Sequence, residues 1–218
     1  MPHERPVLVF GFEPFGGEPL NPSQEIARAL DGCSVREVRV VGRTLPCVFS
    51  AASRQLDRLL REVGPRLVVG VGQAGGRSEI TPERVALNVD DARIPDNAGA
   101  QPIDQPIRRR GPAAYWSTLP IKTVVSALHA EGFPASVSQT AGTFVCNHIF
   151  YGLMHRLRRR RGVRGGFIHV PYTVEQAARH GAGVPGLPLE SMIAAVALAI
   201  EVSLQTRRDL RASGGAIA

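Results

Sequence analysis

Residues 67–71 read Leu-Val-Val-Gly-Val, an apolar run that no polar residue interrupts. A strand with one face in water alternates apolar and polar side chains, whereas a strand buried on both faces is apolar throughout. Gly64 and Pro65 end the helical pattern that precedes the run. The run therefore predicts a central strand of a parallel sheet that is covered by helices on both faces.

Helical and extended patterns alternate on either side of this strand. Apolar residues at three- and four-residue spacing predict helices at 22–30, 49–63, 120–131, 146–160 and 189–208. Short apolar runs predict further strands at 7–10, 35–41, 84–89, 135–139 and 166–170. Asn21 followed by Pro22 is a typical helix start. Residues 90–120 contain several prolines and show no regular pattern, and so long a loop in a compact domain is usually functional.

The alternation of strands and helices predicts one α/β domain over residues 1–218, with a mostly parallel sheet between two layers of helices. The small-residue tail at 212–218 is expected to fray. In sheets of this kind, ligands bind at the carboxyl ends of the strands. Candidate catalytic residues are therefore sought at that edge.

The composition is that of a globular protein in a reducing compartment. Of 218 residues, 44% are hydrophobic, which excludes global disorder. Cys33, Cys47 and Cys146 are too few for a disulfide framework, and no apolar run approaches the roughly 20 residues of a membrane span. The N-terminal residues lack the pattern of a signal peptide. We therefore expect a cytoplasmic protein with no membrane partner.

The net charge of +7 rests almost entirely on arginine, because Lys122 is the only lysine among 26 basic residues. The densest basic group lies at 156–164, at the end of a predicted helix, where positive side chains complement the helix dipole. No aromatic cluster of the kind that binds RNA accompanies it. We therefore expect no nucleic-acid partner.

Cys146 and His169 are the strongest candidates for catalysis. Cys146 opens the predicted helix at 146–160, where the helix dipole stabilises a thiolate and free backbone amides can bind an oxyanion. A buried structural cysteine is the alternative. His169 lies near the carboxyl end of the strand at 166–170, where an imidazole can accept the proton of a thiol. A lone histidine is more often structural, but its pairing with Cys146 favours a nucleophile and its base.

An acidic residue that orients the histidine would complete a triad. Glu83 lies between a glycine-rich turn and an extended segment, and Glu79, Asp90 and Asp91 compete with it for this role. The glycine-rich residues 70–76 are not followed by the helix of a dinucleotide-binding loop, and residues 11–17 lack the lysine of a P-loop. No cysteine and histidine spacing fits a zinc site, so no metal is expected.

Several longer segments carry a resemblance to a known family. They read Gly-Phe-Glu-Pro-Phe-Gly-Gly at 11–17, Val-Gly-Gln-Ala-Gly-Gly-Arg at 71–77, Glu-Arg-Val-Ala at 83–86, Ala-Arg-Ile-Pro-Asp-Asn at 92–97, Thr-Phe-Val-Cys-Asn-His at 143–148 and Gly-Gly-Phe-Ile-His-Val-Pro at 165–171. In this order, over about residues 7–172, they resemble pyroglutamyl peptidase type I, also called pyrrolidone carboxyl peptidase. The resemblance implies a soluble cysteine exopeptidase that removes N-terminal pyroglutamate (5-oxoproline) from peptides through a thioester.

The resemblance also implies the fold, the assembly and the site. The fold would be a single-domain three-layer α/β/α sandwich shared with purine nucleoside phosphorylase-like hydrolases, without metal or organic cofactor, in a homotetramer. The triad would be Cys146, His169 and Glu83, with Arg93 near the reaction centre. The residues that match the family's substrate pocket are Phe12, Phe15, Gln73, Ile94, Phe144 and Val145. Phe12 and Phe15 would sandwich the flat lactam, and a charged glutamate would be excluded because its desolvation is costly.

Two other functions remain to be separated from this one. A nucleoside phosphorylase-like enzyme on the same fold would need a phosphate site and would act on a nucleoside. A non-catalytic module that binds capped peptides or nucleic acid would bind tightly without turnover. The combination of Cys146, His169 and Glu83 argues against a pure binding module.

Overall fold

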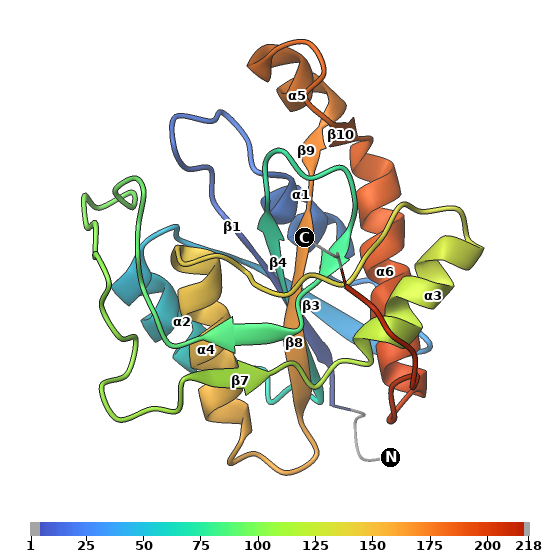
Figure 1. The fold of residues 1–218 in the computed structure, drawn as a ribbon. Helices are drawn as coiled ribbons and strands as arrows, with labels where there is room; N and C mark the ends of the chain where they lie inside the picture. The colour runs from blue at the N-terminus through green and yellow to red at the C-terminus, as the bar shows by residue number, and fades with distance from the viewer. Residues whose placement is uncertain (1–4, 216–218) are drawn as a thin grey trace.

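The computed structural model describes residues 5–215, and a six-stranded sheet forms its centre (Figure 1). The strands are β1 (Val7–Phe12), β2 (Ser34–Val35), β3 (Val38–Leu45), β4 (Leu67–Gln73), β5 (Thr81–Pro82) and β8 (Arg164–Val170), in the order β2-β3-β1-β4-β8-β5. β3, β1, β4 and β8 run parallel, and the short β2 and β5 pair antiparallel at the two edges. β4 is buried along its whole length between β1 and β8, so the prediction from residues 67–71 is confirmed.

Helices cover both faces of the sheet. One layer holds α1 (Pro22–Leu30), α3 (Ile121–Ala130) and α6 (Leu189–Gln205), and the other holds α2 (Phe49–Glu62) and α4 (Val145–Leu157). Successive side chains of a strand point to opposite faces. Accordingly, Val7 and Val9 of β1 pack with the first layer, whereas Leu8 and Phe10 pack with the second. The expected α/β sandwich is confirmed.

The remaining elements lie outside the main sheet. β6 (Val85–Leu87) pairs antiparallel with β7 (Ala114–Trp116), and β9 (Tyr172–Thr173) pairs parallel with β10 (Gly186–Leu187). α5 (Val174–His180) lies between β9 and β10. Apart from β7, residues 90–120 form no helix or named strand, as expected.

The side chain of Asp96 connects this irregular segment to α2 by a hydrogen bond. Its Oδ2 accepts a hydrogen bond of 3.0 Å from the backbone N–H of Phe49, at the start of α2. Its Oδ1 accepts from the backbone N–H groups of Ala98 and Ala100, at 2.9 Å each. The carboxylate therefore ties the loop to α2, in addition to the backbone hydrogen bonds that Asp90 and Gln105 exchange at 2.8 and 2.9 Å.

The structure corrects four predicted elements, two strands and two helices. The predicted strand at 35–41 is a hairpin of β2 and β3, because the backbone turns at Arg36 and Glu37 with φ of 52° and 65°. The predicted strand at 135–139 makes only isolated bridges, from Ala135 to Ile80 and from Ser138 to Glu83. The helices predicted to end at 160 and 208 end at Leu157 and Gln205.

The C-terminal segment, predicted to fray at 212–218, begins with side-chain contacts. Backbone oxygens of Ala212 and Gly214 accept hydrogen bonds from Lys122 and Arg84. The rest of that prediction, at 216–218, lies outside the described residues. Within residues 5–215, every helix is too short or too polar to cross a bilayer.

Candidate active site

Cys146 and His169 both line a cavity of about 570 Å³. The cavity lies at the carboxyl ends of β4 and β8. It therefore lies at the edge of the sheet where a ligand was expected. Loops from across the chain complete its wall. The lining residues are Phe15, Gly16, Glu18, Gln73, Ala74, Gly75, Arg77, Asp91, Arg93, Ile94, Ala141, Gly142, Thr143, Phe144, Cys146, His169, Tyr172 and His180.

Cys146 is the second residue of α4, in the helix start that the sequence predicted. The N-cap residue, Phe144, has no side chain that can accept from the first-turn amides, and no side chain caps the helix. Asn147 anchors the same turn: its Oδ1 accepts from Leu87 N–H at 2.9 Å, and its Nδ2 donates to the oxygens of Leu87 and Val89. The thiol thus lies at an anchored helix N-terminus that no side chain caps.

Gly72 of β4 leaves the space that the thiol occupies. A Cβ at this position would lie 2.8 Å from the Cys146 Sγ and 2.8 Å from the Phe167 ring. Distances of that kind are sterically excluded, so only glycine allows the strand, the ring and the thiol to pack together. The glycine-rich residues 70–76 therefore serve close packing at this point.

The surroundings favour the neutral thiol at rest. Burial is the main cause that raises the pKa of Cys146 to about 12, and the negative charge of Glu83 also raises it. Arg77 and the backbone N–H of Cys146 act in the opposite direction. At neutral pH the thiolate must therefore form by transfer of its proton to a nearby base.

His169 has one ring nitrogen committed to Glu83. Its Nδ1–H donates a hydrogen bond of 2.8 Å to the Glu83 Oε1, and both side chains are almost fully buried. The same oxygen accepts from Arg77 Nη1 at 2.8 Å. With Nδ1 occupied, the Nε2 of His169 is the nitrogen left to take a proton.

Strand pairing explains why Glu83 reaches this histidine. β5 pairs antiparallel with β8 so that Thr81 lies opposite His169 and Pro82 opposite Ile168. Glu83 follows, and its backbone N–H donates to the oxygen of Phe167 at 2.8 Å. Residues 167 and 169 share one face of β8, so Glu83 is the diagonal cross-strand neighbour of His169 on that face.

The other three acidic candidates, Glu79, Asp90 and Asp91, have surroundings that differ from those of Glu83. Asp90 accepts a hydrogen bond of 2.8 Å from a different histidine, His148. Glu79 lines a separate cavity beside α3. Asp91 is on the wall of the Cys146 cavity, and its backbone N–H and oxygen are hydrogen-bonded to Thr143. Among the four candidates, the structure pairs Glu83 with His169.

The predicted substrate-pocket residues divide into two groups. Phe15, Gln73, Ile94 and Phe144 line the cavity, and the rings of Phe15 and Phe144 lie 5.9 Å apart between centroids. Phe12 and Val145 are instead buried in the core, with 2% and 0% exposure. The aromatic pair on the cavity wall is therefore Phe15 with Phe144. Direct contact of Phe12 and Val145 with a substrate stays a prediction.

Arg93 and Cys47 occupy different surroundings. Arg93 is exposed and lies on the cavity wall. Cys47 is buried, with 3% exposure, and its backbone N–H donates to the Glu13 Oε1 at 3.0 Å. Burial and the neighbouring thiol of Cys146 raise the pKa of Cys47 well above its usual range. Cys47 is therefore a poorly reactive thiol next to the candidate nucleophile.

Sequence reasoning missed α5 and the hydrogen bond that it makes to Gln73 of the cavity wall. Gln176 is fully buried, and its Nε2 donates to the Gln73 Oε1 at 3.0 Å, to the Glu18 Oε2 at 3.2 Å and to the Leu20 oxygen at 3.1 Å. Thr173 and Gln176 form a capping box, whose sequence signature is visible in Thr173-Val174-Glu175-Gln176. That signature could have located this helix. Arg77, also missed, has no such signal.

The chain is similar to known proteins over nearly its whole length. A family model described as pyroglutamyl peptidase matches residues 5–206. The pyrrolidone-carboxylate peptidase of Cupriavidus taiwanensis is 60% identical over 211 residues, which are 96% of this chain and 97% of that protein. The one from an Enterobacter species is 56% identical over 212 residues, 97% of this chain and 99% of that protein.

Solved structures agree with the sequence comparisons. Pyroglutamyl peptidase I from Bacillus amyloliquefaciens superposes with a TM-score of 0.93 at 45% identity, and pyrrolidone carboxyl peptidase from Thermococcus litoralis with 0.93 at 40%. Each match covers 96% of this chain and all of the other chain.

Proposed function

The chain belongs to the pyroglutamyl peptidase family, and from this premise we propose that Cys146, His169 and Glu83 are its catalytic residues. It is a cysteine peptidase that removes N-terminal pyroglutamate from peptides. The observation that carries the assignment of residues is the 2.8 Å hydrogen bond from His169 to Glu83, at a cavity whose wall also holds Cys146.

The reaction follows from the positions of these groups. Nε2 of His169 takes the proton of Cys146 as the sulfur attacks the pyroglutamyl carbonyl carbon. First-turn amides of α4 stabilise the negative oxygen of the tetrahedral intermediate. The peptide then leaves with its new amino group protonated by His169, and water hydrolyses the thioester. Glu83 holds the imidazole and stabilises its positive charge while it carries the proton.

Recognition of the lactam is divided between apolar and polar groups. Phe15, Phe144 and Ile94 form an apolar wall for the flat ring. Because Gln176 Nε2 donates to the Gln73 Oε1, the amide NH₂ of Gln73 is left to donate to the lactam carbonyl. Gln176 is therefore a positioning residue for recognition. Phe12 and Val145 support this wall from the core, and Arg93 adds positive charge at the cavity rim.

The test is release of a fluorescent amine from a pyroglutamyl amide, with a prolyl amide as the control substrate. Wild type should cleave only the pyroglutamyl substrate, and Cys146→Ser should lose at least about 10³-fold in kcat/KM with an unchanged melting temperature. Substantial activity in a sequence-verified Cys146→Ser protein would exclude Cys146 as the nucleophile.

We also propose a cytoplasmic homotetramer. The resemblance to the family supports it, as do three free cysteines and the exposed apolar side chains of Trp116 and Ile103, which are 69% and 58% exposed. Light scattering after size-exclusion chromatography should give four times the mass of 23.4 kDa. A monomer mass at micromolar concentration would contradict the assembly.

A further inference from the structure

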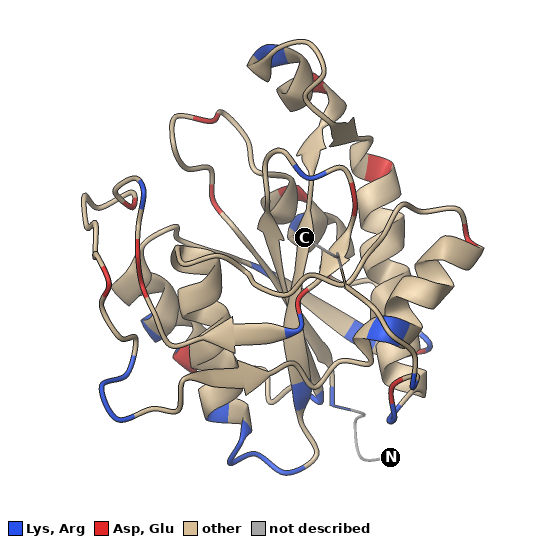
Figure 2. Cartoon of the chain, in the orientation of Figure 1, with Lys and Arg blue, Asp and Glu red and all other residues tan. Residues whose placement is uncertain are grey.

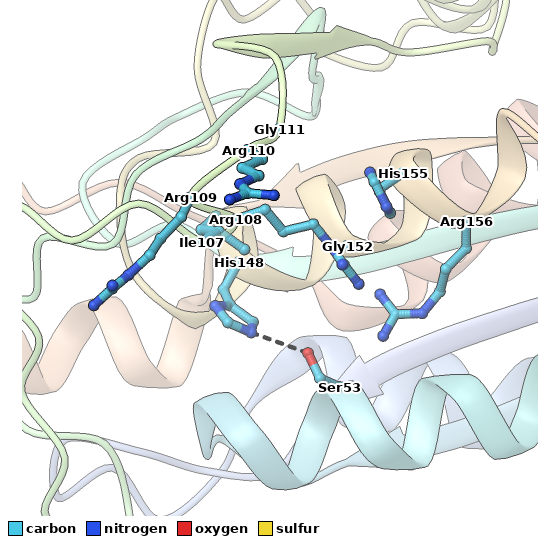
Figure 3. A pocket seen from close by; sticks show the side chains of 10 residues that line it. All are labelled: Ser53, Ile107, Arg108, Arg109, Arg110, Gly111, His148, Gly152, His155 and Arg156. Atoms are coloured by element: carbon cyan, nitrogen blue, oxygen red, sulfur yellow. Dashed lines mark hydrogen bonds between the residues drawn. The ribbon is translucent and has the colours of Figure 1, made fainter.

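A second cavity, of about 520 Å³, shares no lining residue with the Cys146 cavity. It lies between one side of α4, the residue Ser53 of α2 and the turn at 107–111 (Figure 3). Its lining residues are Ser53, Ile107, Arg108, Arg109, Arg110, Gly111, His148, Gly152, His155 and Arg156. Four of these ten are arginines and none is acidic. We propose that this cavity binds a phosphate group, either as inorganic phosphate or as a phosphate monoester.

Neighbouring acids compensate only part of the positive charge of the cavity. Arg156 is the one arginine of the four that has an acidic partner within residues 5–215, through Nε and Nη2 to Asp57. Arg108, Arg109 and Arg110 form no ion pair in the part of the chain that the structure describes. Figure 2 shows basic residues gathered in this turn and in the segment that follows α4. An uncompensated group of guanidinium ions favours a multiply charged anion.

Two of the four arginines, Arg108 and Arg156, extend into one space (Figure 3). In Figure 3, the guanidinium groups of Arg108 and Arg156 approach each other over Gly152. A Cβ at Gly152 would lie 2.7 Å from the Arg156 Nη1, so this nitrogen lies directly against the helix while the other two bind Asp57. Two guanidinium groups in this arrangement can each form charge-assisted hydrogen bonds to the oxygens of one phosphate.

His155 adds a neutral hydrogen-bond donor to the cavity, and its pKa reflects the positive charge of the surrounding arginines. Its Nδ1 is hydrogen-bonded to the Tyr115 hydroxyl at 2.8 Å, which leaves Nε2 for a ligand. Burial lowers the pKa of His155, and the charges of Arg108, Arg158 and Arg156 lower it further. The same positive field that disfavours a charged imidazole favours an anion in the cavity.

The walls of the cavity are fixed before any ligand binds. Asn88 holds the turn through the backbone: its Oδ1 accepts from Arg108 N–H at 2.8 Å, and its Nδ2 donates to the Arg108 oxygen at 2.9 Å. On the opposite wall, His148 donates to Asp90 and is hydrogen-bonded to the Ser53 hydroxyl at 2.9 Å. Because the turn is held by main-chain groups, the arginine side chains can be removed without loss of its anchor.

The experiment titrates the full-length protein with inorganic phosphate and with phenyl phosphate, by calorimetry at constant ionic strength and pH 7. Arg108→Ala should weaken phosphate binding about tenfold, and Arg108→Ala with Arg110→Ala should weaken it further, because each removes charge-assisted hydrogen bonds. The matched control is Arg161→Ala, which removes the same charge from an exposed residue outside the cavity and should bind as wild type does. Cys146→Ala should also bind as wild type.

Tighter binding of phenyl phosphate would assign the cavity to a monoester, and tighter binding of inorganic phosphate would assign it to the free ion. The proposal is overturned if wild type binds phosphate no better than it binds chloride. It is also overturned if Arg161→Ala weakens binding as much as Arg108→Ala does, because the effect would then be one of net charge.

Discussion

Glu83→Gln should make the Cys146 thiol more reactive toward an alkylating agent and at the same time slow turnover of the substrate. The negative charge of Glu83 is one of the causes that raise the pKa of this thiol to about 12, second only to burial. The amide keeps the size of the side chain but removes the charge, so the pKa of Cys146 should fall and more thiolate should form at any given pH. Turnover should fall at the same time, because His169 loses the carboxylate that orients it and stabilises its charged form.

The size of both effects can be estimated. A nearby charge shifts a pKa by roughly 1–3 units. Each unit raises the thiolate fraction tenfold but lowers the intrinsic nucleophilicity about threefold, so alkylation should accelerate about three- to fourfold per unit. Loss of one charge-assisted hydrogen bond in a triad lowers kcat by about 10²- to 10⁴-fold.

The assay measures iodoacetamide alkylation of Cys146 by peptide mass spectrometry, beside turnover of a pyroglutamyl amide. Exposed Cys33 is the internal reference in each sample. The wild-type rate at Cys146 should rise about tenfold per pH unit from pH 7 to 10, without a plateau, because the pKa lies near 12. Glu79→Gln, which removes a charge from outside the cavity, is the matched control and should change neither readout.

Either of two results would refute this reasoning. If Glu83→Gln slowed alkylation in parallel with turnover, or if the wild-type rate already had a plateau near neutral pH, Cys146 would rest as a thiolate paired with a charged His169. The carboxylate would then stabilise the nucleophile rather than oppose its ionisation.

Three further substitutions test separate parts of the structure. Gln176→Leu should raise KM about tenfold with little change in kcat, because Gln73 loses the hydrogen bond that orients its amide; an unchanged KM would remove Gln176 from recognition. Asp96→Ala should lower the free energy of unfolding in urea by about 2 kcal/mol, since three backbone N–H groups lose their acceptor, and a loss below the error of the fit would contradict that anchor. Gly72→Ala should lower kcat about 10²-fold by displacing the Cys146 thiol. Wild-type kinetics would contradict this, because β4 would then have shifted to accommodate the methyl group without moving the thiol.

Much of the fold could be predicted from periodicity alone. The run at 67–71 fixed the centre of the sheet, and the alternation of Val7 and Val9 with Leu8 and Phe10 reflects two helical layers. Elements whose local signal is short or absent could not be found. The turn at Arg36 and Glu37 has positive φ without the glycine or asparagine that marks such turns, so the hairpin read as one strand.

The candidate nucleophile and base were also visible in the sequence, because each lies at the end of a strongly patterned element. Cys146 begins an amphipathic helix and His169 is followed closely by Pro171, which ends an apolar strand. The resemblance then singled out Glu83 from four acidic candidates and added the pocket residues. Its sandwich of the lactam by Phe12 and Phe15 stays a prediction, and the phenylalanines that line the cavity are Phe15 and Phe144. A burial pattern alone does not tell which of two nearby phenylalanines faces the cavity.

Glu83 shows why the third residue of the proposed triad was the hardest to derive. It follows a strand of two residues, too short to give any periodic signal, and its partner is 86 positions away along the chain. Its role depends on the antiparallel register that puts Thr81 opposite His169, since a shift of one residue would turn the carboxylate to the other face of the sheet. Arg77 adds a second dependence, because its guanidinium binds both Thr81 and Glu83 and so holds the register and the carboxylate together. The acidic member of the proposed triad is therefore positioned by strand pairing, which no local pattern in the sequence encodes.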